Sequence, residues 1–320
     1  MKVYISRNIP QAGIDLLIDN GIEVRINSAN KKLTQEELIE ACQQVDFLLN
    51  VGHADLNDYF FQHCKHLKGV ALASVGYDHV DISAAYKWEI PVSNTPDVLS
   101  AATADVAFLL MLAVSRKAFY RAKEVFDGKW KDFEFTQDLG IELEGKTLGI
   151  YGLGRIGLEL AKKAKAAYNM QIIYHNRSRN VEAEKLLDAR YVNFDALLQQ
   201  SDVLSVHANL SPETQYRFDK DAFKRMKKNA IFINTARGKV HHEEDLTAAL
   251  QRGDIWGAGL DVTDPEPMEA NNVLLQMPNV CVLPHIGSAT LETRTRMAVM
   301  AASNLVAVAK GKTMANAVNL

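Results

Sequence analysis

A glycine-rich turn at positions 152–157 constrains the fold of this chain more than any other segment. It reads Gly152-Leu153-Gly154-Arg155-Ile156-Gly157, after an apolar stretch that ends at Tyr151 and before the helix-forming stretch Leu158–Ala167. Between a strand and a helix, the first glycine permits a tight turn, the second lets backbone approach a pyrophosphate, and the third lets the helix pack on the strand. The helix N-terminus then offers N–H groups and partial positive charge to the phosphates. The segment therefore predicts a dinucleotide-binding domain of the Rossmann type.

The residues after the next predicted strand bear on which dinucleotide is bound. A carboxylate about 20 positions beyond the glycines would bind the ribose 2′-hydroxyl of NAD. Here Gln171–Tyr174 is followed by His175-Asn176-Arg177-Ser178-Arg179, in which no carboxylate is present. Arginine and serine can bind a 2′-phosphate through charge-assisted hydrogen bonds. We therefore expect NADP(H) to be preferred, with NAD(H) also usable; the alternative is a solvated basic loop without a cofactor role.

Short apolar stretches alternate with helical patterns in both halves of the chain. Strands are predicted at Val3–Ile5, Glu23–Ile26, Phe47–Leu49, Val70–Ala73 and Pro91–Ser93, and then at Thr147–Tyr151, Gln171–Tyr174, Val203–His207, Ala230–Asn234, Gly257–Leu260 and Val280–Leu283. Between the second and third strands, Thr34 followed by Glu37 predicts a capped helix that runs to Cys42. The alternation implies parallel sheets with helices on both faces. We expect an α/β protein with two doubly wound parallel-sheet domains, one flavodoxin-like and one Rossmann.

Two long helical patterns set the domain boundaries. Ser100–Phe126 reads as one helix, and since its part Ala104–Val114 is apolar nearly all round, we expect it between domains or at a subunit contact. Leu291–Ala309 lies too far from the last predicted strand to act as a crossover, so it should return to the first domain. We therefore expect a discontinuous substrate or catalytic domain, 1–98 plus 288–320, and a dinucleotide-binding domain, 99–287.

Polar residues collect where the predicted strands of the second half end. Since ligands of open parallel sheets bind beyond the carboxyl ends of the strands, these residues are candidates for a site. They are Gly152, His175, His207, Thr235, Ala236, Arg237, Asp261 and His285. Arg237 can hold a carboxylate in bidentate fashion, and His285 is a candidate acid–base group. Glu266 beside His285 would favour the imidazolium and orient the ring. Each of the three alone is compatible with an ordinary loop residue, so the hypothesis depends on their shared edge.

Six motifs in a fixed order span almost the whole chain. They are Ala73–Asp81, Asn94–Leu99, Gly152–Gly157, Asn234–Gly238, Gly259–Pro267 and Leu283–Thr290. In this order they resemble the D-isomer-specific 2-hydroxyacid dehydrogenase family, in particular its glyoxylate/hydroxypyruvate reductase branch, with the 2-ketogluconate reductases nearby. The resemblance implies an NAD(P)-dependent oxidoreductase that reduces a small 2-keto acid to the D-2-hydroxy acid, and a homodimer.

The resemblance also implies a role for each matching residue. Arg237 would bind the substrate carboxylate and carbonyl, His285 would be the acid–base residue, and Glu266 would be its carboxylate partner. Substrate contacts would also come from the backbone N–H groups of Val75 and Gly76 and from Ser288. Cofactor contacts would come from Thr103, Gly152, Gly154, Arg155, Ile156, Gly157, His175, Asn176, Arg177, Ser178, His207, Thr235, Ala236, Asp261, His285 and Gly287.

Three points stay open at this level. The sequence does not choose between glyoxylate, hydroxypyruvate and 2-ketogluconate. The acidic segment Trp130–Phe135 departs from the reductase pattern expected before the second domain. Some relatives are transcriptional corepressors on the same fold, so an NAD(P)-sensing interaction protein is the alternative to an enzyme. A disordered partner-binding extension would favour that alternative, and none is visible in the sequence.

The charge, the cysteines and the histidines argue against nucleic-acid binding, membrane insertion and metal binding. The formal net charge of −3 gives no field that would attract nucleic acid or an acidic membrane. No stretch reaches the ~18 apolar residues of a membrane-spanning helix. The widely spaced Cys42, Cys64 and Cys281 suit a reducing cytoplasm, where we expect the protein. The runs His241–Glu244 and His63–His66 do not match a metal motif, so we expect no metal site.

Overall fold

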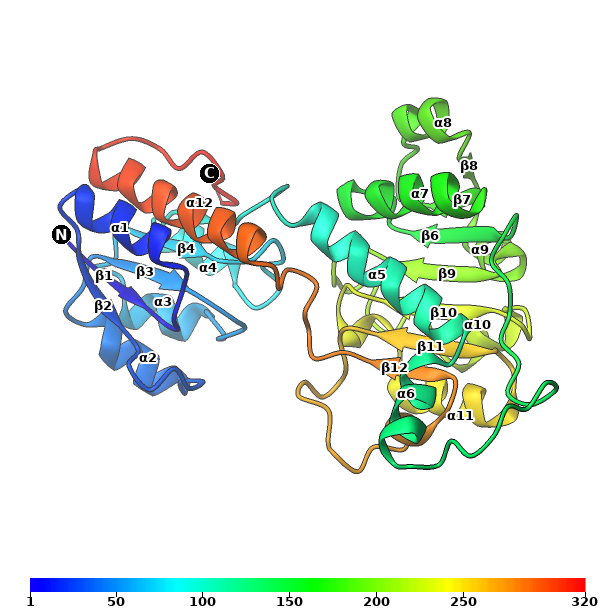
Figure 1. The fold of residues 1–320 in the computed structure, drawn as a ribbon. Helices are drawn as coiled ribbons and strands as arrows, with labels where there is room; N and C mark the ends of the chain where they lie inside the picture. The colour runs from blue at the N-terminus through cyan, green and yellow to red at the C-terminus, as the bar shows by residue number, and fades with distance from the viewer. Residues whose placement is uncertain (320) are drawn as a thin grey trace. The chain divides into compact units, whose positions relative to one another are not determined.

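The computed structural model describes residues 1–319 and forms two compact units, each built on a parallel β-sheet (Figure 1). The first unit comprises Met1–Leu99 and Ala289–Leu320, and the second comprises Ser100–Ser288. These boundaries lie one residue from the expected ones. The described residues contain no helix that is both long enough and apolar enough to cross a membrane.

The first unit is a five-stranded sheet flanked by helices. Its strands are β1 (Lys2–Ile5), β2 (Glu23–Ile26), β3 (Phe47–Asn50), β4 (Gly69–Leu72) and β5 (Val92–Ser93), and its helices are α1 (Gln11–Asp19), α2 (Gln35–Cys42), α3 (Asp58–His63), α4 (Ile82–Lys87) and α12 (Leu291–Ala309). The strand order is β2-β1-β3-β4-β5, with every pair parallel. This is the flavodoxin-like order of a doubly wound sheet, as predicted.

Local sequence signals and distant packing together fix this unit. Thr34 accepts a hydrogen bond from the Glu37 backbone while the Glu37 side chain accepts one from Thr34, so the predicted capping box is present at the start of α2. At the other end of the chain, α12 lies beside α1 (Figure 1), where a Cβ added at Gly13 would come within 2.9 Å of the Ala298 Cβ. The predicted return of this helix to the first domain is what the structure has.

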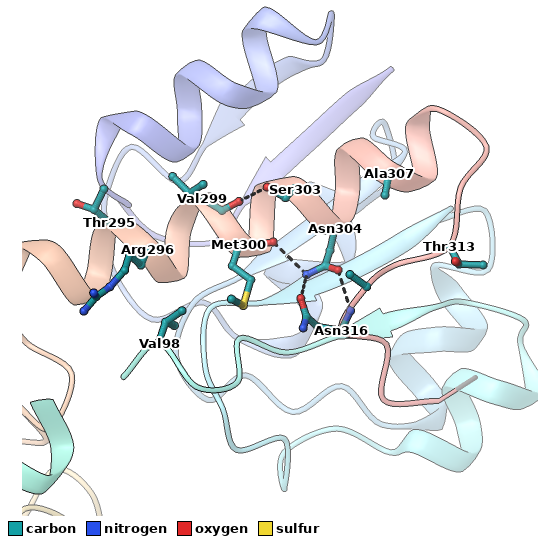
Figure 2. A pocket seen from close by; sticks show the side chains of 11 residues that line it. Val98, Thr295, Arg296, Val299, Met300, Ser303, Asn304, Ala307, Thr313 and Asn316 are labelled. Carbon is teal, nitrogen blue, oxygen red and sulfur yellow. Dashed lines mark hydrogen bonds between the residues drawn. The ribbon is translucent and has the colours of Figure 1, made fainter. Parts of the chain in front are cut away.

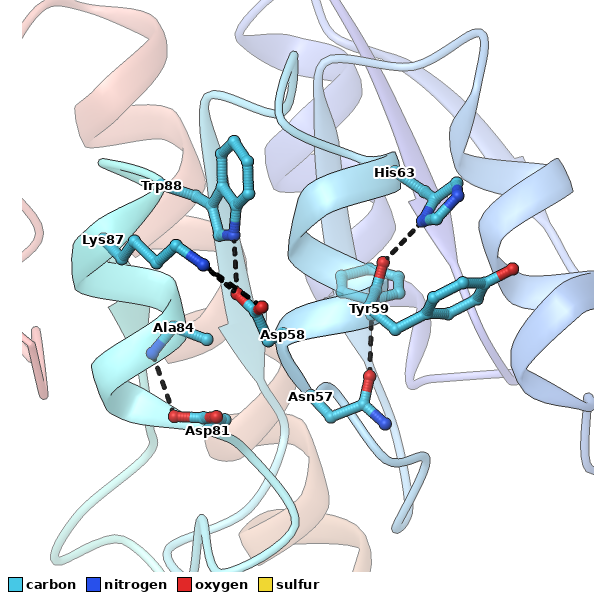
Figure 3. A network of polar contacts seen from close by, with 9 residues as sticks. Asn57, Asp58, Tyr59, His63, Asp81, Ala84, Lys87 and Trp88 are labelled. Carbon is cyan, nitrogen blue, oxygen red and sulfur yellow. Dashed lines mark hydrogen bonds and ion pairs between the residues drawn. The ribbon is translucent and has the colours of Figure 1, made fainter.

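A polar network joins α3 to α4 at the surface of the first unit (Figure 3). The Asp58 carboxylate accepts hydrogen bonds from Nε1 of Trp88 at 2.8 Å and from Nζ of Lys87 at 3.0 Å. Asn57 and Asp81 cap the N-termini of the two helices through their side-chain oxygens. The hydrogen bond from Trp88 is the main cause that lowers the pKa of Asp58.

The second unit is a seven-stranded parallel sheet. Its strands are β6 (Thr147–Tyr151), β7 (Gln171–His175), β8 (Arg190–Tyr191), β9 (Val203–Val206), β10 (Ile231–Asn234), β11 (Gly257–Leu260) and β12 (Val280–Val282). Its helices are α5 (Ser100–Ser115), α6 (Ala118–Phe126), α7 (Arg155–Tyr168), α8 (Val181–Leu187), α9 (Phe194–Gln200), α10 (Lys220–Arg225) and α11 (Glu243–Arg252), with 3₁₀ turns η1 (Gly238–Val240) and η2 (Val273–Gln276). The order β12-β11-β10-β9-β6-β7-β8 is that of a Rossmann sheet with one strand added beyond β11.

The prediction of six strands in this unit is wrong by one. The structure adds β8, a two-residue edge strand that pairs with β7 through Ile173 with Arg190 and Tyr174 with Tyr191. Two residues carry too little periodicity to be recognised as a strand, and only the neighbouring strand identifies them.

The prediction of one helix over Ser100–Phe126 is also wrong. The helix stops at Ser115 and resumes at Ala118, after Lys117 has adopted a left-handed backbone with φ 54°. The Ser115 carbonyl accepts a hydrogen bond from the Ile141 N–H at 2.9 Å, and Gly140 leaves room for this approach, because a Cβ there would overlap the same carbonyl. A distant segment thus takes the carbonyl that a continuing helix would use.

Candidate functional site

The glycine-rich turn lies between β6 and α7, as predicted. Gly152 has φ +95°, and a Cβ there would lie 2.6 Å from the Ala208 nitrogen, so this position requires glycine. A Cβ at Gly157 would press on the Gly152 carbonyl at 2.9 Å, whereas one at Gly154 would meet nothing within 4 Å. No side chain caps α7 at Gly154. Open space above an uncapped helix N-terminus is what a pyrophosphate needs, so these residues fit a dinucleotide.

The loop after β7 is tied to this turn. Oδ1 of Asn176 accepts a hydrogen bond from the Leu153 N–H at 2.6 Å, and its Nδ2 donates to the Leu153 carbonyl at 3.3 Å. Nδ1 of His175 contacts the Val192 carbonyl at 2.9 Å, so its ring is held toward the edge of the sheet. Arg177 and Ser178 are exposed. The predicted loop and the predicted turn therefore lie together at the carboxyl edge of the second sheet.

Although the segment 175–179 contains no carboxylate, the expectation that both of its arginines are available to a 2′-phosphate is wrong for Arg179. Its Nε and Nη2 donate to the two carboxylate oxygens of Glu184 at 3.0 and 2.6 Å. Glu184 lies in α8, beyond the segment that the sequence argument considered. The only local signal for the pair was its spacing of five residues, which does not identify an ion pair at a helix start.

A buried pair behind Arg237 was missed in the sequence. Nδ2 of Asn234 donates to the Arg237 carbonyl at 2.8 Å and contacts Nδ1 of His241 at 3.0 Å, while its Oδ1 accepts from the Ala236 N–H at 2.9 Å. Asn234 and His241 are both 0% exposed. Burial lowers the pKa of His241 to about 3, so its imidazole is neutral. One asparagine side chain therefore closes the turn that carries Arg237.

The turn after β12 carries the acid–base candidate. Nδ1 of His285 lies 2.6 Å from Oε1 of Glu266. His285 has φ 53°, a left-handed conformation that is uncommon for a histidine. Behind it, the buried Asp261 accepts hydrogen bonds from the N–H groups of Ile286 and Gly287, both at 2.8 Å. Asp261 thus holds the turn that places His285, and burial is the largest cause that raises its pKa.

Two further expected cofactor contacts bind protein groups of the same unit. Thr103 in α5 donates from Oγ1 to the Gly287 carbonyl at 3.1 Å. His207 contacts Ser205 through Nε2 at 2.9 Å and Thr235 through Nδ1 at 3.4 Å. Burial lowers the pKa of His207 to about 3, so this ring is also neutral. Both residues brace the carboxyl edge of the sheet.

The expected substrate-binding loop lies in the first unit, after β4. Oγ of Ser74 donates to the Gly76 carbonyl at 2.8 Å, and Nδ2 of Asn94 donates to the Val75 carbonyl at 2.9 Å. These two hydrogen bonds fix the backbone of the loop. Ser288, expected in the first domain, falls at the end of the second unit.

The first unit also contains a cavity of about 450 Å³ beside α12 (Figure 2). Its wall includes Val98, Met300 and Ala307, and on one side Asn304 is hydrogen-bonded to Asn316 (Figure 2). None of the predicted site residues lines it. The candidate site is defined instead by the turns at the carboxyl edge of the second sheet.

Comparison with known proteins decides the family. Residues 108–287 match the model of the D-isomer specific 2-hydroxyacid dehydrogenase, NAD binding domain. A glyoxylate reductase of Thermococcus litoralis is 44% identical over 322 residues, which is 99% of this chain and 96% of that one. The chain belongs to the D-isomer specific 2-hydroxyacid dehydrogenase family. It is therefore an oxidoreductase, and its second unit is a nicotinamide-dinucleotide-binding domain.

Solved structures of this dehydrogenase family share the whole fold. A glyoxylate reductase from Paecilomyes thermophila superposes with a TM-score of 0.87 at 32% identity, covering 99% of this chain and 98% of that one. An NADPH-dependent glyoxylate/hydroxypyruvate reductase from Sinorhizobium meliloti, in complex with NADP and malonate, gives a TM-score of 0.84 at 29% identity, covering 99% and 96%. The predicted fold class of this dehydrogenase is thereby confirmed.

Proposed function

We propose that this dehydrogenase reduces a small 2-keto acid, namely glyoxylate, hydroxypyruvate or 2-ketogluconate, to the D-2-hydroxy acid with NADPH. The observation that carries the proposal is the 2.6 Å contact between His285 and Glu266. A carboxylate on Nδ1 orients the imidazole ring and leaves Nε2 as the proton donor. The names of the relatives, glyoxylate reductases among them, support the substrate class.

Each residue of the proposed site has one task. Bound NADPH supplies the hydride that reaches C2 of the keto acid. The Arg237 guanidinium binds the substrate carboxylate and polarises the carbonyl, so it both orients the substrate and stabilises developing negative charge. His285 gives its Nε2 proton to the alkoxide as it forms. We also assign substrate contacts to the backbone N–H groups of Val75 and Gly76 and to Ser288, with the first unit as the substrate domain.

The cofactor would be held by the second unit. We assign its contacts to Thr103, Gly152, Gly154, Arg155, Ile156, Gly157, His175, Asn176, Arg177, Ser178, His207, Thr235, Ala236, Asp261, His285 and Gly287. The exposed Arg177 and Ser178 support a preference for NADPH, since they can bind a 2′-phosphate. The family model names NAD, so we expect NADH to be usable as well.

Steady-state kinetics test both parts of this proposal. We expect turnover of at least one of the three keto acids, with a higher kcat/KM for NADPH than for NADH. Arg177→Gln should lower kcat/KM for NADPH and leave that for NADH nearly unchanged. Equal values for the two cofactors, or a preference for NADH, would contradict the NADPH assignment. Absence of turnover with all three acids would contradict the substrate assignment.

We further infer a homodimer in a reducing compartment. The apolar helical stretch Ala104–Val114 gives limited support, because most of its large side chains pack inside the second unit, and Leu109, at 44% exposed, is the largest exception. Stronger support comes from the end of α6 and the chain that follows it, where five large apolar side chains are 63% to 92% exposed, namely Phe126, Trp130, Phe133, Phe135 and Leu139. Monomers rarely expose such a patch, and a second copy of the chain would cover it. The three cysteines of the protein are buried free thiols, which suits a reducing compartment.

Light scattering tests the dimer directly. The expected mass is twice the 35.6 kDa of one chain. The double substitution Trp130→Ser and Phe133→Ser should shift the protein toward the mass of one chain, since it removes two of the most exposed apolar groups. A single-chain mass for the unmodified protein at micromolar concentration would contradict the proposal.

A further inference from the structure

The loop between β7 and α8 is held rigidly against the glycine-rich turn. Besides Asn176, its last residue Asn180 donates from Nδ2 to the Leu153 carbonyl at 3.1 Å. Oδ1 of Asn180 caps α8 by accepting from the Ala183 N–H at 3.0 Å. The backbone N–H of Asn180 donates to Oη of Tyr174 at 2.8 Å. The exposed side chains of this loop therefore project from a fixed backbone.

The Glu184 carboxylate, in the first turn of α8, is fixed by a buried tyrosine and binds an arginine of this loop. Tyr174 is buried, and its Oη donates to Oε1 of Glu184 at 2.5 Å. The Glu184 side chain is only 15% exposed, whereas that of its partner Arg179 is 65% exposed. The hydrogen bond from Arg179 is the largest cause that lowers the pKa of Glu184, so the carboxylate is ionised at neutral pH. The rigid member of the ion pair is the glutamate.

The geometry of the pair is bidentate. Nε and Nη2 of Arg179 each bind one oxygen of Glu184, the arrangement in which a guanidinium fork matches a carboxylate best. Arg177, two residues earlier on the same loop, is exposed, and no ion pair within 4.0 Å involves it among residues 1–319. Its charge still reaches Glu213, whose pKa is lowered by a hydrogen bond from Ser211 and also by Arg177. The loop thus carries two guanidinium groups, of which one has its charge balanced within the protein.

We propose that Glu184 is a specificity-determining residue for the cofactor, because it holds Arg179 in a bidentate pair and leaves Arg177 as the cation available to a 2′-phosphate. The inference rests on the proposed use of NADPH and deepens it. An ionised carboxylate near the loop also opposes the approach of a dianionic 2′-phosphate. Glu184 therefore reduces the discrimination against NAD(H) that two unpaired arginines would give.

Binding of adenosine fragments tests this without turnover. We compare adenosine 2′,5′-bisphosphate with 5′-AMP by calorimetry, since the two differ only in the 2′-phosphate. Glu184→Gln keeps an acceptor for Tyr174 but removes the charge, so the bisphosphate should bind about tenfold more tightly while 5′-AMP changes little. The matched control is Glu182→Gln, which removes the same charge from an exposed residue in the same helical turn.

Arginine variants give an independent arm that does not depend on the fold of the Glu184 variant. On its own, Arg179→Gln should lower bisphosphate affinity, because the Glu184 carboxylate then loses the guanidinium that balances its charge. Added to Glu184→Gln, it should cancel the tenfold gain, a coupling that a double-mutant cycle measures. Thermal unfolding of each variant reports whether the loop scaffold survives.

Two outcomes would overturn the inference. One is an equal gain from Glu182→Gln and Glu184→Gln, which would mean a general charge effect. The other is absence of coupling: if Arg179→Gln does not cancel the gain from Glu184→Gln, the released guanidinium does not bind the phosphate. Failure of the NADPH proposal is a separate result: the unmodified protein would then bind both fragments equally, and Arg177→Gln would change neither.

Discussion

The two sheets follow the same topological rule but differ at the point where their strand order reverses. In the first unit this point lies between β1 and β3, and in the second between β6 and β9. A ligand crevice is expected at such a point in any doubly wound sheet. In the first unit the protein fills it. Oγ of Ser6 donates to Oδ1 of Asn50 at 3.1 Å and accepts from the Val51 N–H at 2.8 Å.

In the second unit the corresponding point is left open by glycine. Gly152 and Gly154 contribute no side chain, and a Cβ on Gly154 would project into empty space. The flanking residue His207 is held aside by Ser205. The comparison teaches that topology offers a crevice in both units, while the residues of the first turn decide whether it is closed by hydrogen bonds or left for a ligand.

The largest expected effect concerns the chemistry that we assign to the second unit. His285→Ala should lower kcat with glyoxylate by about 10²–10⁴-fold, the usual contribution of a general acid, with NADPH affinity little changed. Arg237→Ala should instead raise KM steeply and also lower kcat, because the keto acid loses its carboxylate partner. A near-normal kcat in His285→Ala would overturn the assignment of the proton donor.

Glu266→Gln examines the same pair by removing the charge of the carboxylate that contacts Nδ1 of His285. Because the imidazole ring then loses the partner that orients it, kcat with glyoxylate should fall while NADPH affinity changes little. Steady-state kinetics check this, and an unchanged kcat would separate Glu266 from the proton donor.

Gly154→Ala should reduce the open crevice with little disturbance of the fold. Gly154 has an extended backbone with φ −91°, and its Cβ would meet nothing, so thermal unfolding of the cofactor-free protein should change little. Cofactor affinity should fall by at least about tenfold, about 1.4 kcal/mol. Gly152→Ala, whose Cβ would collide with Ala208, should instead destabilise the protein. Normal cofactor binding by Gly154→Ala would contradict the comparison.

Ser6→Ala tests the closed crevice. The substitution leaves the buried Asn50 and the Val51 N–H each without a partner, which should cost about 1–3 kcal/mol of unfolding free energy. Cofactor affinity should be unchanged, because the closure belongs to the first unit. Ser303→Ala, at an exposed position on α12, is the matched control and should stay within about 0.5 kcal/mol. Urea denaturation measures the loss of stability, and cofactor titration checks that cofactor affinity is unchanged.

The last effect appears only in acid and concerns the stability of the second unit. The pKa of His241 is about 3 in the folded protein and about 6.5 when exposed, so the unfolded state binds the proton more readily. Stability is therefore fully present above pH 6.5 and falls as the pH drops from there toward 3, by up to about 1.4 kcal/mol per pH unit. His241→Val should flatten this dependence in urea denaturation. An identical pH slope in the variant would contradict a buried neutral histidine.

The sequence by itself determined what short-range patterns encode. All strands but β8, the α2 capping box and the limits of α12 follow from periodicity and caps that neighbouring residues carry. The glycine turn is likewise determined locally, because its three glycines are required by the tight turn and by the helix that follows it. The motifs around Glu266 and His285 were readable too, and the structure places their side chains 2.6 Å apart.

Only the tertiary structure decided contacts between segments that local pattern does not relate. The helix after Ser100 ends at Ser115 because Ile141 takes its carbonyl. Arg179 is neutralised by Glu184 because Tyr174 holds that carboxylate from the core. The turn that carries His285 is held by Asp261, which lies 25 residues before Ile286 in the sequence. In each case the sequence pattern does not identify the hydrogen-bond partner, and folding brings it near.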